Sequence, residues 1–240
     1  MKKNKFLLLL IVVLQLAFIG SPEPKVDHKI WNELLTKHVG RNGVVNYLGF
    51  KGEKQKLISY INILQSNHPS STWPKNEAKA YWINAYNAFT VKLILENYPI
   101  ESIMKINNGK AWDIKFIKIG KNTYSLNNIE HDILRPKYKD ARIHFAVNCA
   151  SVSCPKLSNK AFNSSSLEKH LNDMTMAFLN DASKNKITAK EVKISKLFEW
   201  YESDFKMNGS VIDFINKYSK VQAEPDAKIS YQEYNWNLNN

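Results

Sequence analysis

Residues 142–157 concentrate the reactive side-chain types of this chain. The segment reads Arg-Ile-His-Phe-Ala-Val-Asn-Cys-Ala-Ser-Val-Ser-Cys-Pro-Lys-Leu and holds both cysteines together with His144. His131 lies shortly before it, in Glu130-His131-Asp132. Thiol, imidazole and carboxylate groups are those that cysteine-dependent catalysis uses, so this part of the chain predicts a functional site.

The pair Cys149 and Cys154 has several interpretations. In an exported chain the default is a structural disulfide, because a turn brings two cysteines at this spacing within bonding range. A metal site is a weaker alternative, since four intervening residues are more than the common zinc spacing has; a metal-dependent hydrolase would use His131 and His144. Two free, inert thiols are also compatible with the spacing.

A catalytic interpretation assigns Cys149 as the nucleophile and His131 as its base. A thiolate needs a histidine or another positive group within hydrogen-bond reach. Glu130 would orient the imidazole of His131, and an amide such as that of Asn84 would donate to a developing oxyanion.

Apolar residues alternate with other residues over 142–149, which predicts a strand that ends at Cys149. His144 and Asn148 would then face away from the sulfur. We therefore expect His144 and Asn148 to bind a ligand or to form structural hydrogen bonds.

The stretch Lys75 to Tyr98 is apolar nearly all round and lies between Pro74 and Pro99, which predicts a buried helix. Asn84 and Asn87 point to the same side of this helix. A buried amide without a partner costs about 1–3 kcal/mol, so both must reach polar groups. They either form a structural network or line a site, with Asn84 as oxyanion donor and Asn87 as a binding residue.

Residues 124–135 are expected to form a short helix that Pro136 ends, with His131 and Arg135 one turn apart. Arg135 can either bind an acidic ligand or pair with Asp132 or Glu130. We favour the ion pair, and keep Arg135 among the candidate binding residues.

The remaining pattern predicts a helix-rich α+β fold with a small, mostly antiparallel sheet around the buried central helix. No repeat or flexible linker divides residues 26–240, which we expect to form one globular domain. Further helices are expected over 26–39, 54–65, 165–180, 197–205 and 211–218, and strands over 114–119, 187–195 and 229–238.

The N-terminus has the layout of a secretory signal peptide over residues 1–21. Three lysines precede the apolar run Phe6 to Ile19, and Gly20-Ser21-Pro22 follows it. The sequence therefore predicts export to the periplasm or the medium. The protein would contact a membrane only through this segment, if it stays uncleaved.

Composition and absent motifs narrow the function. The net charge of +12 is scattered as lysine without a long basic block, so we expect no nucleic-acid partner. There is no Gly-rich phosphate loop, no Gly-x-Ser-x-Gly and no His-Glu-x-x-His motif. We expect no metal and no cofactor, and a small molecule or a peptide as the partner.

Several motifs in order resemble the domain-of-unknown-function 547 family over roughly residues 70–180. They are Tyr81-Trp82-Ile83-Asn84-Ala85-Tyr86-Asn87-Ala88, Ile129-Glu130-His131-Asp132-Ile133-Leu134-Arg135 and Ile143-His144-Phe145-Ala146-Val147-Asn148-Cys149-Ala150-Ser151, followed by Cys154-Pro155-Lys156-Leu157.

Later segments also fit the resemblance, namely Phe198-Glu199-Trp200-Tyr201 with Asp204-Phe205, and the closing Tyr234-Asn235-Trp236-Asn237-Leu238. The family usually has Asp where this chain has Asn235. Similar domains occur in exported bacterial proteins and in plant proteins behind a coiled coil. The resemblance implies no established activity, substrate or cofactor.

Two functions from different classes follow. The first is an exported thiol hydrolase or acyl/peptidyl transferase that uses Cys149, His131, Glu130 and Asn84. The second is a non-enzymatic binding or interaction module in which Cys149–Cys154 is a structural disulfide.

Overall fold

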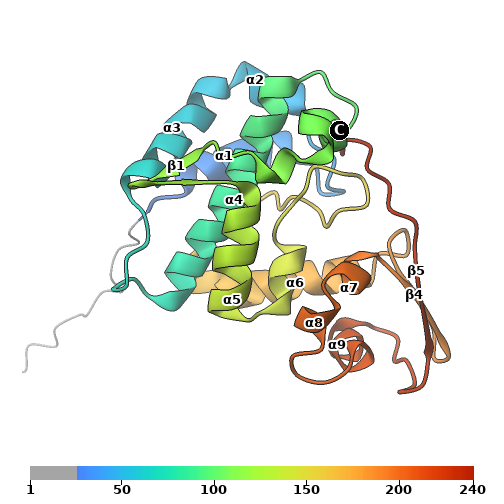
Figure 1. The fold of residues 1–240 in the computed structure, drawn as a ribbon. Coiled ribbons are helices and arrows are strands. Elements are labelled where there is room, and N and C mark those ends of the chain that lie inside the picture. Colours follow the sequence, from blue (N-terminus) through green and yellow to red (C-terminus); the bar gives the residue numbers. More distant parts are fainter. Residues whose placement is uncertain (1–25) are drawn as a thin grey trace, which may run out of the picture.

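The computed structural model describes residues 26–240, so the expected signal peptide lies outside the described part. Figure 1 shows helices gathered around one buried helix, with two small sheets at the periphery, and confirms the helix-rich α+β class. None of the helices in residues 26–240 is long and apolar enough to cross a bilayer. The α-helices are α1 (Lys29–His38), α2 (Tyr47–Gly52), α3 (Lys54–Ser66), α4 (Lys75–Asn97), α5 (Arg135–Tyr138), α6 (Leu167–Leu179), α7 (Leu197–Trp200), α8 (Glu202–Phe205) and α9 (Val211–Tyr218).

The buried central helix is α4, and it agrees with the expectation. Its backbone begins after Pro74 and ends at Asn97, before Pro99. Proline fixes the extended entry and prevents continuation of the helix beyond its end. Helices α2 and α3 and the segment after Ser125 pack against it, so nearly every face of α4 is buried.

Two separate sheets replace the single sheet that the sequence predicts. In the first, β1 (Ile117–Ile119) pairs antiparallel with β2 (Asn122–Tyr124). In the second, β3 (Lys186–Ile187) pairs antiparallel with β4 (Glu191–Ile194), which pairs in parallel with β5 (Lys228–Tyr231).

The C-terminal strand is shorter than expected because the chain leaves the sheet after Tyr231. The tail then runs back across the molecule (Figure 1) and forms an antiparallel bridge between Leu238 and Ser151. The last residues therefore hold the cysteine segment instead of extending the sheet.

Residues 142–149 do not form the expected strand. Ala141–Phe145 is a short 3-10 helix, η4. The side chain of Asp140 accepts a hydrogen bond from the backbone N–H of Arg142 at 3.1 Å and so caps the first turn. Ile143 to Ala146 are all buried. The alternation of apolar residues in the sequence therefore does not correspond to one buried and one exposed face.

The helix that carries Glu130 and His131 is a π-helix, η3 (Asn128–Leu134), and it continues into α5. The expected stop at Pro136 was wrong. Pro136 lies in the first turn of α5, directly after the π-helix, and the helical backbone continues to Tyr138. A π-helical turn is wider than an α-turn and is often found at functional sites.

Asn84 and Asn87 form a structural network that fastens α4 to two distant segments. Asn84 accepts from the N–H of Phe162 at 3.0 Å and donates to its carbonyl at 2.7 Å. Asn87 donates to the carbonyl of Ala146 at 2.8 Å and accepts from the N–H of Asn148 at 2.9 Å. Both amides are buried, and each donates one and accepts one hydrogen bond, which satisfies four backbone groups in the core.

We predict that Asn84→Ala lowers the free energy of unfolding by about 2–4 kcal/mol, because it leaves the buried N–H and carbonyl of Phe162 without partners. Denaturant unfolding monitored by circular dichroism measures this change. Asn62→Ala, on the exposed face of α3, is the control and should change stability by less than about 0.5 kcal/mol. Equal effects of the two substitutions would show that the network adds no stability.

Candidate functional site

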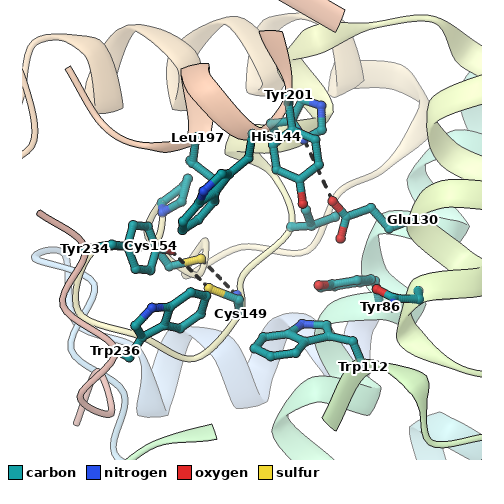
Figure 2. A pocket seen from close by; sticks show the side chains of 14 residues that line it. Tyr86, Trp112, Glu130, His144, Cys149, Cys154, Leu197, Tyr201, Tyr234 and Trp236 are labelled. Atoms are coloured by element: carbon teal, nitrogen blue, oxygen red, sulfur yellow. Dashed lines mark hydrogen bonds and ion pairs between the residues drawn. The ribbon is translucent and has the colours of Figure 1, made fainter. Parts of the chain in front are cut away.

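A pocket of about 200 Å³ lies where η3, η4 and the cysteine segment meet α7 and the C-terminal tail (Figure 2). Aromatic rings form most of its wall, and a thiol, an imidazole and a carboxylate face it. Its lining residues are Tyr86, Trp112, Asn127, Glu130, His144, Val147, Cys149, Cys154, Pro155, Leu197, Trp200, Tyr201, Tyr234 and Trp236.

The two cysteines are free thiols and do not lie at disulfide distance, so the expected disulfide is not supported. The Sγ of Cys154 instead accepts a hydrogen bond from the backbone N–H of Cys149 at 2.9 Å. The Sγ of Cys149 is 3.3 Å from the hydroxyl of Ser151 and 3.3 Å from that of Tyr234. The turn thus brings the cysteines together as hydrogen-bond partners.

These contacts give the two thiols different pKa values. Burial alone would raise the pKa of Cys149, but hydrogen bonds from Cys154, Ser151 and Tyr234 outweigh it and lower that pKa below the ordinary thiol value. Burial, followed by the neighbouring Cys149, raises the pKa of Cys154. Cys149 is therefore the more acidic thiol of the pair, and Cys154 is the less acidic one.

Asn148 holds the cysteine turn in shape. Its side chain accepts from the N–H of Ala150 at 2.9 Å and donates to the carbonyl of Pro155 at 2.7 Å. Ala150 has a left-handed backbone with φ of 58°, a conformation that a non-glycine residue adopts only when its surroundings impose it. The tail supports the same turn, since the N–H of Val152 donates to the carbonyl of Asn237 at 2.8 Å.

His144 is buried between two carboxylates. Its Nε2 is 2.7 Å from Oδ2 of Asp204, and its ring stacks on Tyr201 with 3.9 Å between centroids. Its Nδ1 is buried, has no hydrogen-bond partner among residues 26–240, and lies 3.9 Å from Oε1 of Glu130, beyond hydrogen-bond distance. The bond to Asp204 places the ring proton on Nε2 and leaves a lone pair on Nδ1 in the neutral imidazole.

Arg135 fixes the position of Asp204. Its Nε and Nη2 donate to the two carboxylate oxygens at 2.6 and 3.0 Å. Burial would raise the pKa of Asp204, but hydrogen bonds from His144 and Arg135 hold that pKa well below its usual range. Arg135 does form an ion pair, with Asp204 and not with the neighbouring Asp132 or Glu130 that the sequence suggested.

The structure does not bring His131 and Asn84 to the sulfur. His131 lies outside the pocket wall, where its Nδ1 accepts from Arg135 at 2.7 Å. Asn84 is committed to Phe162 in the core. Of the residues predicted from sequence, Cys149, Glu130 and His144 share the pocket.

Three residues from the C-terminal third of the chain were missed as participants; Tyr201 and Tyr234 line the pocket, and Asp204 lies behind His144. Asp204 and Tyr201 hold the ring of His144, while Tyr234 contacts the sulfur. The only signal for them was the resemblance of their segments to a family. Spacing along the chain could not link them to Cys149, because distant segments are joined only by folding.

No three His, Cys, Asp or Glu side chains within residues 26–240 are grouped so that they could hold a metal ion.

Asn235 uses its side-chain oxygen to accept from the N–H of Asn237 at 2.9 Å, which a carboxylate at that position could also do.

Fold and pocket define a helix-rich α+β domain with a thiol and an imidazole in one aromatic cavity. Residues 70–179 match the model of the family described as "Protein of unknown function, DUF547", and the chain thus carries a DUF547 family domain. No curated protein and no solved structure matches the chain.

We predict that iodoacetamide modifies Cys149 before Cys154, and that the pH midpoint of this reaction lies below the ordinary thiol pKa, because hydrogen bonds stabilise the thiolate. Alkylation rates across a pH series, with peptide mass spectrometry, measure this. Cys154→Ser and Cys149→Ser assign the adducts. Tyr234→Phe should move the midpoint upward, since it removes a donor to the sulfur. Faster modification of Cys154 would contradict the assignment.

Proposed function

We propose that this protein is a cysteine-dependent acyl-transfer enzyme, either a hydrolase or an acyl/peptidyl transferase. Cys149 is the nucleophile, His144 is the general base, and Asp204 orients the imidazole. The observation that carries the proposal is the buried Nδ1 of His144, which has no hydrogen-bond partner and belongs to the same pocket as a thiol of lowered pKa.

The arrangement has the division of roles found in nucleophile–histidine–carboxylate sites. Asp204 holds Nε2–H, so that Nδ1 is free to take and return a proton. Arg135 keeps Asp204 ionised and in place. Tyr201 covers one face of the ring and restricts its rotation. His144 therefore replaces His131, the base that the sequence suggested.

The reaction proceeds in two balanced steps. The sulfur of Cys149 attacks the acyl carbonyl carbon, while the thiol proton passes to Nδ1 of His144. The bond to the leaving group breaks, the leaving group takes that proton from Nδ1, and a thioester remains. Water or an amine then attacks the thioester and gives a proton to Nδ1, and the sulfur leaves and takes that proton, which restores the thiol and the neutral imidazole.

The oxyanion that forms during each attack needs a hydrogen-bond donor. Asn84 cannot supply it from the core. The hydroxyls of Tyr234 and Ser151, each 3.3 Å from the sulfur, are placed beside the reacting carbon. We assign this role to Tyr234, which lines the pocket.

Export belongs to the same proposal, and its support is the sequence of residues 1–21. The enzyme would then act in the periplasm or outside the cell on a small molecule or a peptide. Two thiols in an oxidising compartment would need protection, and burial of Cys154 beside Cys149 gives some.

A second candidate is a binding module without a reaction. The aromatic wall of the pocket favours it, because stacked and tilted rings bind an organic group whatever the state of the thiol. The expected disulfide is no longer part of this alternative.

We predict that p-nitrophenyl acetate transfers its acetyl group to Cys149 with a burst of p-nitrophenol. Mass spectrometry of the trapped thioester and stopped-flow absorbance measure it. Cys149→Ala should give no adduct, and His144→Gln should slow acylation by about 100-fold or more. His170→Gln, a histidine outside the pocket that contacts Ser158, is the control and should keep the rate. A loss in His131→Gln with none in His144→Gln would contradict the assigned base.

We further predict that Asp204→Asn slows acylation by about 100-fold or more, because the amide no longer holds the tautomer with a free Nδ1. The pH profile of the acylation rate is the decisive readout, since Asp204→Asn should change its imidazole limb. Asp181→Asn, which alters a partly buried loop carboxylate outside this pocket, is the matched control. An unchanged profile in a folded Asp204→Asn protein would show that Asp204 acts only on stability.

A further inference from the structure

We infer that the pocket binds an alkylammonium group, such as a lysine side chain of a peptide substrate. The inference names the substrate class of the proposed enzyme and rests on that function only for the chemistry that follows binding. It starts from the pocket volume of about 200 Å³, which is smaller than the 300–1,000 Å³ typical of sites for drug-sized ligands. The cavity therefore suits one side chain or one small headgroup.

The charge of the lining is opposite to that of the chain. The protein has 34 Lys and Arg residues and a net charge of +12, yet none of the pocket-lining residues is Lys or Arg. Glu130 is the carboxylate on the wall, and it points into the cavity in Figure 2. The wall of this cavity carries a carboxylate and no basic side chain, although the protein as a whole is basic. The wall is therefore complementary to a cation.

Within residues 26–240, no Lys or Arg side chain forms an ion pair with Glu130. It is only 4% exposed, and a buried carboxylate needs compensating charge or donors. Its contact with His144 is 3.9 Å, and Arg135 gives its donors to Asp204 and His131. Burial raises the pKa of the Tyr201 phenol, and the charge of Glu130 and the hydrogen bond that Tyr201 gives to Glu130 raise that pKa further. An ammonium group in the pocket would compensate the charge of Glu130.

The aromatic wall suits both parts of such a ligand. Tyr234 and Trp236 are 4.5 Å apart between ring centroids, Trp200 is 4.8 Å from Tyr234, and Trp112 is 5.8 Å from Trp236. Methylene groups pack on these faces, and ring faces attract a cation. A neutral apolar ligand would use the rings and leave Glu130 uncompensated.

The test uses Cys149→Ala protein, so that binding is measured without any reaction. Quenching of tryptophan fluorescence reports titration with Nα-acetyl-lysine amide and, as the uncharged comparison, Nα-acetyl-norleucine amide. We expect lysine to bind at least about tenfold more tightly. The preference should disappear in the additional variant Glu130→Gln and persist in Glu96→Gln, which alters an exposed carboxylate on α4.

n-Butylamine separates the two sources of an alkylammonium group. Tighter binding of the lysine amide assigns a peptide, and equal binding assigns a free amine. Norleucine binding as tightly as lysine, or a lysine preference that survives Glu130→Gln, would overturn the inference. A lysine preference in Cys149→Ala protein, combined with no acyl adduct on wild-type protein, would sustain this inference and reject the proposed enzyme.

Discussion

The buried amide of Asn87 is the constraint on which the site depends. It binds the carbonyl of Ala146 and the N–H of Asn148, the residues on either side of Val147. His144 lies just before this clamp and Cys149 just after it. Because α4 is buried on nearly all sides, the amide cannot move without opening the core. The separation of imidazole and thiol is therefore set by a helix that contributes neither group.

A second level of support comes from the end of the chain. Asn148 fixes the turn that follows Cys149, and the tail crosses it through the bridge between Ser151 and Leu238. The same tail brings Tyr234 to the sulfur. Without the tail, the left-handed Ala150 and the lowered pKa of Cys149 would both lose groups that sustain them. Segments beyond the matched family region, residues 70–179, thus complete a site that lies within it.

The sequence was informative wherever composition alone determined burial. The all-round apolar stretch with two asparagines predicted α4 and the need to satisfy its amides, and both are present. It failed over 142–149, because alternation reports a strand only when one face is exposed, and this segment is buried on both. The misassigned strand turned His144 away from Cys149 and left His131 as the base. Asp204 could not be found from spacing, because its link to His144 exists only in the folded chain.

The two carboxylates beside His144 differ in a way that divides their roles. Asp204 is bound by two guanidinium nitrogens and by Nε2, so its charge is already compensated and its position fixed. Glu130 stands 3.9 Å from Nδ1, on the wall of the cavity, with only a phenol as a close donor. A carboxylate held by fixed partners, such as Asp204, can orient a base, but its charge is not available to a ligand. The charge of the buried Glu130 is incompletely compensated. A ligand that supplies a positive charge therefore gains binding free energy there. In the proposed function, the imidazole therefore separates Asp204, which orients the base, from Glu130, which selects the ligand.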